Sequence, residues 1–214
     1  MNIRFTAGGF LLGAFATLVT TQAVSQDAPA MPTPEQMKEM MEIHARVTTP
    51  GPGHRALDHF IGDWETTTKV YWGGPSMPPS EASGTATMKW VLDGRFVREE
   101  SAWTMPMPDP ETGELVPTPA QGLGLFGYDN HRNLYVASWA DSINTHLLSV
   151  RGSADPSGRV FRYYGEMDEP MLGVTGRMVK YETRIVDRNT HVVDIYDLHV
   201  GEEYKVIEIT YRRR

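Results

Sequence analysis

The chain has 214 residues, a formal net charge of −7 and no cysteine. This length is enough for one sizeable domain, and the missing cysteine excludes disulfides, thiolate metal sites and thiol catalysis. The acidic balance makes nucleic acid and anionic membrane surfaces poor partners.

Residues 1–25 have the pattern of a secretory signal peptide. Arg4 supplies a positive charge, residues 5–19 are apolar or small, and Ser25 follows small residues at a spacing that suits cleavage. The apolar run is shorter than the about 20 residues that a comfortable membrane span needs. We therefore expect a periplasmic or secreted bacterial protein without stable membrane insertion after cleavage. The alternative is a signal peptide that is retained as an anchor.

Residues 26–53 are predicted to form a spacer and an amphipathic helix. Residues 26–34 are rich in proline and alanine, which is typical of a flexible linker. The helix is expected to begin after Thr33, and Gln36 is placed to complete a capping box. A second short helix is expected over residues 54–61.

Residues 54–214 alternate short strand patterns with turn signals, and Asp93-Gly94 is the strongest hairpin signal among them. Alternation with period two, clearest in residues 205–212, predicts a sheet with one dry and one wet face. We therefore predict an all-β domain, a roughly ten-stranded antiparallel up-and-down β-barrel of the lipocalin or calycin type, preceded by one or two helices. The predicted strands are 64–72, 82–92, 95–104, 121–128, 134–141, 146–152, 159–166, 176–186, 190–199 and 203–212. Three segments are expected to be loops that gate the barrel, namely 73–80, 105–119 and 167–175.

The start of the first strand, Gly62-Asp63-Trp64, resembles the opening of lipocalin-like barrels. The resemblance implies that Trp64 plugs the closed end of the barrel. It also implies that an arginine near the last strand, which we assign as Arg212, stacks on this tryptophan.

Several stretches match a known family in both order and spacing. They are Gly53-His54-Arg55-Ala56-Leu57, Ile61-Gly62-Asp63-Trp64, Gly84-Thr85-Ala86-Thr87, Leu92-Asp93-Gly94-Arg95-Phe96, residues 122–130, Trp139-Ala140-Asp141-Ser142, Thr183-Arg184-Ile185-Val186-Asp187 and residues 208–213. From about residue 51 to residue 213, the chain resembles a family of exported bacterial proteins known only as domain of unknown function 1579. The resemblance implies a lipocalin-like barrel and brings no activity with it.

Aromatic residues in the predicted strands are the first candidates for a ligand site. If several of the strand tryptophans Trp72, Trp90, Trp103 and Trp139 face inward, they line an apolar pocket that also offers polar indole groups. Of these, Trp72, Trp90 and Trp139 enter the predicted site. The alternative is that these side chains fill the barrel or cover its outer surface under the helices.

Three polar residues complete the candidate ligand-binding set. Asp141 shares a strand face with Trp139, and Arg184 could neutralise a ligand carboxylate, although a surface salt bridge with Glu182 competes for it. His146 lies beside apolar residues and could bind haem iron, with an ordinary hydrogen-bonded histidine as the alternative. No metal site, catalytic residue or cofactor is predicted, and haem remains a minor alternative.

We expect a binding module whose barrel holds a small apolar or amphipathic molecule. One alternative is an enzyme on the same barrel that uses a polar cluster such as His146, Asp141, Arg184 and Glu208. Another is a filled barrel with a structural or protein-contact role, which would use the methionine-rich helix as its contact surface. The sequence pattern sets neither the ligand nor the oligomeric state.

Overall fold

The computed structural model describes residues 31–109, 111–169 and 173–214. Ten antiparallel strands close into a barrel in which each strand pairs with its neighbours in the chain and β1 pairs with β10. The prediction of an all-β, up-and-down barrel is therefore confirmed. The predicted signal peptide and most of the predicted spacer lie outside the described residues.

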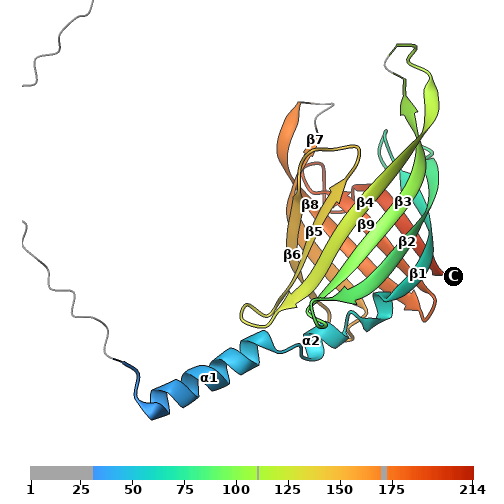
Figure 1. Ribbon diagram of the computed structural model, residues 1–214. Coiled ribbons are helices and arrows are strands. Elements are labelled where there is room, and N and C mark those ends of the chain that lie inside the picture. Colours follow the sequence, from blue (N-terminus) through green and yellow to red (C-terminus); the bar gives the residue numbers. More distant parts are fainter. Residues whose placement is uncertain (1–30, 110, 170–172) are drawn as a thin grey trace, which may run out of the picture.

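The strands run up and down around the barrel in chain order (Figure 1). Their bounds are β1 Gly62–Val70, β2 Ser80–Val91, β3 Phe96–Pro108, β4 Leu115–Asp129, β5 Leu134–Asp141, β6 Leu148–Ala154, β7 Val160–Glu169, β8 Val174–Asp187, β9 Thr190–Asp197 and β10 Lys205–Arg213. All ten predicted strands are present, in the predicted order.

Two of the predicted loops are shorter than expected because strands continue into them. In the segment 105–119, β3 and β4 extend as a two-stranded ribbon that rises above the rest of the barrel, with Pro106 opposite Pro117 (Figure 1). Each ribbon strand has a single partner, so the missing proline N–H groups leave no second ladder incomplete. In the segment 167–175, β7 continues to Glu169 and β8 begins at Val174.

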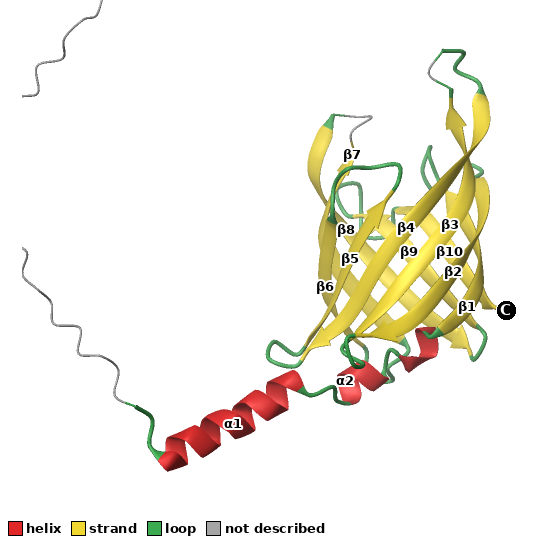
Figure 2. Cartoon of the chain, in the orientation of Figure 1, coloured by secondary structure: helices red, strands yellow, loops and turns green. Residues whose placement is uncertain are grey.

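The helices lie at the opposite end of the barrel from the ribbon (Figure 2). Helix α1 spans Pro34–Thr48, and its capping box between Thr33 and Gln36 is formed as predicted. Helix α1 has no buried residue and runs away from the barrel. Among the residues that the structure describes, no helix is both long and apolar enough to span a membrane.

The predicted second helix is divided into α2, Pro52–Arg55, and a 3-10 turn at Asp58–Phe60. Between them, Leu57 is almost completely buried against the barrel end. The hydrophobic core therefore begins at this closed end, where the short helical segment caps the barrel.

Candidate functional site

The closed end of the barrel is plugged by aromatic side chains around Trp64. Trp64 is fully buried, and its indole N–H donates to the carbonyl oxygen of Phe60 at 2.8 Å. His191 packs edge-on against Trp64, with ring centroids 4.5 Å apart, and stacks on Tyr211 at 4.4 Å. The structure places Trp64 at the closed end of the barrel, where we predict the plug.

The arginine that stacks on Trp64 is Arg213, not the predicted Arg212. The guanidinium carbon of Arg213 lies 4.2 Å from the ring centroid, and its nitrogens donate to the carbonyl oxygens of Ile61 and His59 at 2.7 and 2.8 Å. The reason is the two-residue period of a strand, which turns Arg213 to the same side as the buried Tyr211 and leaves Arg212 exposed.

Immediately above the plug, several inward side chains keep accessible surface, while others, such as Val179 and Ile195, are buried. Four residues in register on β1, β10, β9 and β8, namely Thr68, Ile209, Val193 and Thr183, stand on the inward side of their strands. All four are only half-buried, although they lie in the middle of a closed sheet. We call the space that these side chains border the lumen; a pocket of about 20 Å³ toward its open end is lined by Thr68, Trp72 and Trp103, among other residues.

Glu99 on β3 supplies a buried acid at the lower boundary of the lumen. The residue is 2% exposed, and its Oε1 accepts hydrogen bonds from Ser101 Oγ at 2.5 Å and from Tyr211 Oη at 3.1 Å. Burial raises the pKa of this carboxyl, against the lowering effect of the two hydrogen bonds. The environment therefore favours the protonated acid.

Two tryptophans, Trp103 and Trp139, lie together on the inward face of the barrel with their ring planes inclined by 31° to each other. The rings of Trp139 and Trp103 lie over Gly122 of β4, where a Cβ atom would stand 3.0 Å from the Trp103 ring and would collide with that of Trp139. At Gly124 a Cβ would meet the Phe126 ring first, at 2.7 Å, and the Trp139 ring at 3.2 Å. Glycine at both inward positions lets the indoles lie against the strand, and Gly124 is the residue paired with Glu99.

At the open end of the barrel, Arg177 and Asp197 form an ion pair. Arg177 Nη2 lies 2.6 Å from Asp197 Oδ2, and both side chains are largely buried. Among the described residues of β8 and β9, Arg177 and Asp197 are the two opposite charges on the inward face, and they neutralise each other. The lumen therefore runs from an ion pair at the mouth to the buried carboxyl of Glu99 near the plug.

The structure brings together Trp139 and Asp141 from the predicted ligand-binding set. Trp139 Nε1 donates to Asp141 Oδ2 at 3.1 Å, and Asp141 Oδ1 accepts from the backbone N–H of Ile143. Asp141 thus orients the Trp139 indole on the lumen wall. His146 lies apart from the pair, in the connection between β5 and β6.

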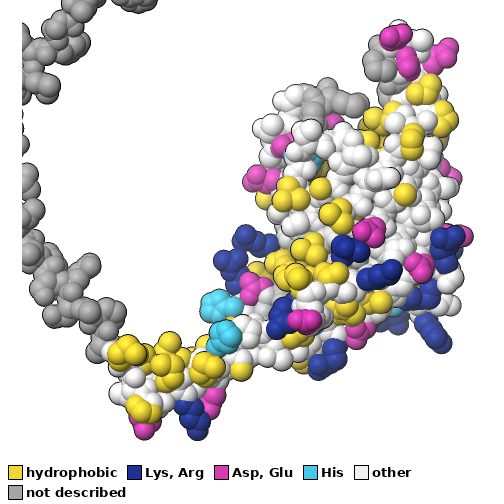
Figure 3. Space-filling view, in the orientation of Figure 1, with side chains coloured by type: hydrophobic (Ala, Val, Ile, Leu, Met, Phe, Trp, Pro, Cys, Tyr) yellow, Lys and Arg dark blue, Asp and Glu magenta, His cyan; other side chains and the backbone are white. Residues whose placement is uncertain are grey.

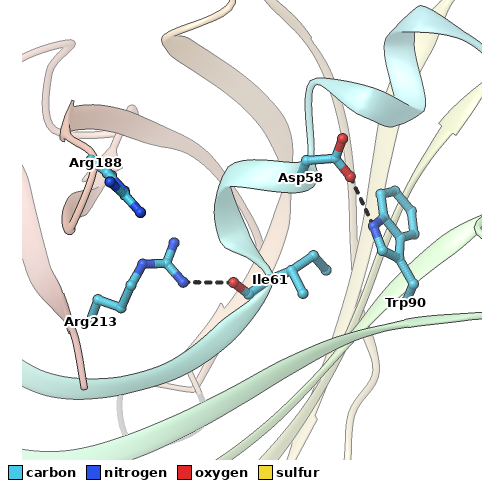
Figure 4. A pocket seen from close by; sticks show the side chains of 5 residues that line it. All are labelled: Asp58, Ile61, Trp90, Arg188 and Arg213. Carbon is cyan, nitrogen blue, oxygen red and sulfur yellow. Dashed lines mark hydrogen bonds between the residues drawn. The ribbon is translucent and has the colours of Figure 1, made fainter.

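The two other predicted tryptophans lie at opposite ends of the barrel. Trp72 follows the end of β1, is 58% exposed and lines the same small pocket at the open end as Thr68 and Trp103. Trp90 lies at the closed end, where its Nε1 donates to Asp58 Oδ1 at 3.0 Å. A hollow of about 510 Å³, open to solvent, is lined there by Trp90, Asp58, Ile61, Arg188 and Arg213 (Figure 4). Two of its five side chains, those of Trp90 and Arg213, already hydrogen-bond to the helical segment. We therefore attribute this hollow to the attachment of the cap to the barrel end.

Arg184 lies on the outer face of the barrel in a cluster of ion pairs. Its Nη2 is 2.6 Å from Asp194 Oδ2, and its Nε is 3.7 Å from Glu182 Oε1. Lys205 approaches the other oxygen of Asp194 at 2.7 Å and Glu208 at 2.8 Å. Desolvation lowers the pKa of Lys205, but attraction to Asp194 and Glu208 outweighs it and raises the pKa overall. The hypothetical catalytic cluster of His146, Asp141, Arg184 and Glu208 is not assembled.

Sequence reasoning missed Glu99, Ser101 and Tyr211 as site residues, and it considered Trp103 for a pocket without including it in the predicted site. A signal for Glu99 was present, because Glu99 and Glu100 are adjacent in a strand and must point to opposite faces. One of the two carboxyls therefore had to enter the barrel. Across the described residues, no group of three or more histidine, aspartate or glutamate side chains could hold a metal ion.

Comparisons with solved structures show similarity of fold. The barrel resembles Rv2717c from M. tuberculosis, with a TM-score of 0.50 and 14% identity over 78% of this chain and 99% of that one. The S-type phycobiliprotein lyase CPES from Guillardia theta gives a TM-score of 0.43 and 9% identity, covering 77% of this chain and 98% of the other. A redesigned β-barrel, b11L5F_LGL, gives 0.35 and 12% identity, with 75% and 96% covered.

No curated protein matches the sequence. A family model does match, with the description "Protein of unknown function (DUF1579)", and it covers residues 49–213. The match begins at the short helical cap and includes all ten strands, the plug and the lumen. Because the match covers well over half of the sequence, the chain belongs to the DUF1579 family.

Proposed function

We propose that this protein is a binding module that holds a small, largely apolar molecule in the lumen of its barrel. The observation that carries the proposal is the half-buried state of inward side chains above a fully packed plug. The accessible surface of these inward side chains is what a guest in the barrel would cover. Trp103 and Trp139 offer this guest an aromatic wall.

The position of the charges supports an apolar guest. Most ion pairs lie on the outer face, and inside the barrel Arg177 and Asp197 neutralise each other at the mouth. A charged ligand would have to leave water without gaining a free counter-charge in the described part of the lumen, which is costly. An uncharged ligand meets no such cost.

We further propose, from residues 1–25 alone, that binding takes place in a periplasmic or extracellular space. N-terminal sequencing of protein recovered from its own cells tests this proposal. A mature chain that begins near residue 26 supports export. An intact Met1 in the soluble fraction contradicts it.

Adjacent valines on β9 provide a matched test of lumen binding. Val193 points into the barrel and Val192 points outward, and both are half-buried. In Val193→Trp the added indole occupies the lumen, so the affinity for the uncharged fluorophore N-phenyl-1-naphthylamine should fall by about tenfold or more. Val192→Trp should bind within about twofold of the unmodified protein, because the same indole then lies outside.

Fluorescence titration measures both affinities, and circular dichroism verifies that both variants are folded. Equal affinities in the two folded variants would show that the fluorophore binds elsewhere. That result would count against the proposed function.

A further inference from the structure

We propose that Glu99 is the polar anchor of the lumen and donates a hydrogen bond from its carboxyl O–H to an uncharged carbonyl group of the ligand. The inference rests on the proposed function and adds the chemical class of the guest. That class is an apolar molecule, with a planar part that suits the tryptophan wall, which carries a ketone, aldehyde, quinone, ester or amide oxygen.

The hydrogen bonds of Glu99 leave one of its oxygens available. Both donors, Ser101 Oγ and Tyr211 Oη, bind Oε1, and no partner for Oε2 is found in the described part of the chain. Glu99 Oε2 is not among the enclosed side-chain atoms that lack a hydrogen bond in the described residues. The remaining exposure of Glu99 therefore places Oε2 against accessible space.

The surroundings of Glu99 keep its proton in place. On the neighbouring strands, the residues paired with Glu99 are Met88 of β2 and Gly124 of β4, neither of which titrates. From β10 the phenol of Tyr211 faces it, and burial raises the pKa of that phenol as well. Burial likewise raises the pKa of Glu99 itself. Among the described residues no cation pairs with this carboxyl, and its burial favours the protonated form, which is a hydrogen-bond donor.

A donor in an apolar cavity selects for a neutral acceptor. The O–H of a protonated carboxyl donates readily to a carbonyl oxygen. A guest without an acceptor oxygen would leave this buried donor unsatisfied, which costs free energy. A carboxylate guest would bring a negative charge that Arg177, already paired with Asp197, does not neutralise. The site therefore discriminates in the order carbonyl, then hydrocarbon, then carboxylate.

The tryptophan wall sets the position of the guest relative to Glu99. Trp139 lies close to Gly124, which is paired directly with Glu99, and Trp103 lies on the same wall two residues beyond Ser101. The centroids of the two indoles are 6.2 Å apart. A planar group stacked on Trp139 thus carries a substituent at its edge toward Oε2.

Three related fluorophores test the inference. They are 6-propionyl-2-(dimethylamino)naphthalene, which carries a ketone, its 6-propyl analogue without oxygen, and 6-(dimethylamino)-2-naphthoate, which carries a carboxylate. Dissociation constants are measured by fluorescence for the full protein and for Glu99→Gln and Glu99→Leu. The infrared C=O stretch of the bound ketone gives a second readout.

The full protein should bind the ketone about fivefold more tightly than the propyl analogue, as one net hydrogen bond allows, and should bind the naphthoate most weakly. Glu99→Gln should keep this order, because its amide N–H also donates. Glu99→Leu should lose the preference for the ketone while binding of the propyl analogue stays within about twofold. The ketone stretch should shift to lower wavenumber in the full protein and in Glu99→Gln only.

Different results would overturn different claims. Binding of the propyl analogue that Val193→Trp blocks, without a preference for the ketone, would overturn the role of Glu99 and leave lumen binding intact. The tightest binding for the naphthoate, or an unchanged ketone preference in Glu99→Leu, would also overturn it. Failure of all three fluorophores to bind would overturn the proposed function and this inference together.

Discussion

At the scale of single residues, function and stability depend on which face of a strand a side chain occupies. Arg212 and Arg213 have the same chemistry, yet Arg213 stacks on Trp64 and Arg212 is exposed. Glu99 and Glu100 differ in the same way, since Glu99 is buried and Glu100 is exposed. Adjacent identical residues therefore provide internal controls for both the plug and the lumen.

Replacement of Arg213 should show what the plug contributes. Arg213→Ala removes two hydrogen bonds to the carbonyl oxygens of Ile61 and His59 together with the contact on Trp64. We expect the free energy of unfolding to fall by about 2 kcal/mol. Urea denaturation, followed by tryptophan fluorescence, measures the change.

Arg212→Ala is the matched control and should change stability by less than about 0.5 kcal/mol, because its side chain lies on the exposed face. If the two alanine variants lost the same stability, the assignment of Arg213 to the plug would be wrong.

At the scale of secondary-structure elements, α1 and the cap contribute very differently. Helix α1 buries none of its residues and is held to the barrel by Asn130 Nδ2, which donates to the carbonyl oxygens of Arg46, Val47 and Thr49. Figure 3 shows apolar side chains gathered along this helix, and the exposed ones include Met37, Met40 and Met41. The cap that follows contributes the buried Leu57 to the core.

Deletion of residues 31–47 should therefore lower the free energy of unfolding by less than about 1 kcal/mol, the value of the lost hydrogen bonds. Leu57→Ala, in contrast, should cost about 3 kcal/mol, because it leaves a cavity under the cap. Chemical denaturation of both variants checks the pair. A deletion that proved as costly as Leu57→Ala would show that α1 is part of the folded core.

The number and order of the strands could be predicted because turn signals and period-two alternation are local. Asp93-Gly94 does form a turn, with positive φ at both residues. The ribbon of β3 and β4 was not predicted, because Pro106 and Pro117 argue against strands at these positions. Proline is tolerated there only if each strand has a single partner. That condition depends on the tertiary structure and is not visible in the sequence.

The site was predictable in part for the same reason. The pairing of Trp139 with Asp141 followed from residues two apart on one face. The hydrogen bond between Glu99 and Tyr211 joins residues that are 112 positions apart, so only closure of the barrel creates it. Whether the inward face is filled depends on the sum of side-chain volumes from ten strands, which local patterns do not report.

At the scale of the whole molecule, the barrel combines a packed, largely neutral plug with a lumen above it. A belt of ion pairs lies on its outer face. The plug should make stability depend on pH. Desolvation, with the positive charges of His59 and Arg213, lowers the pKa of His191 from 6.5 to about 3. Between these values the unfolded chain binds a proton that the folded chain does not, so stability is lost as the pH falls below 6.5.

His191→Phe should remove this dependence. The unmodified protein should lose up to about 1.4 kcal/mol per pH unit through this residue on acidification, and the variant should show a correspondingly flatter profile between about pH 6 and pH 4. Thermal or urea unfolding across this range measures the slope. An unchanged slope in His191→Phe would contradict the assignment of a neutral, desolvated histidine.

Glu99 should act in the opposite direction. Its pKa is raised on folding, so above the ordinary value of 4.5 the unfolded chain releases a proton that the folded chain keeps, and stability falls as the pH rises. Glu99→Gln should therefore be more stable than the unmodified protein near neutral pH and lose this advantage in acid. A buried acid that weakens the fold is consistent with a binding role.

The most direct test of lumen binding is a crystal structure of the protein in complex with the naphthyl ketone. We predict electron density for the fluorophore inside the barrel, stacked on Trp139, with the ketone oxygen within hydrogen-bonding distance of Glu99 Oε2. A lumen filled by the protein's own side chains, or a fluorophore bound only on the outer surface, would contradict the account.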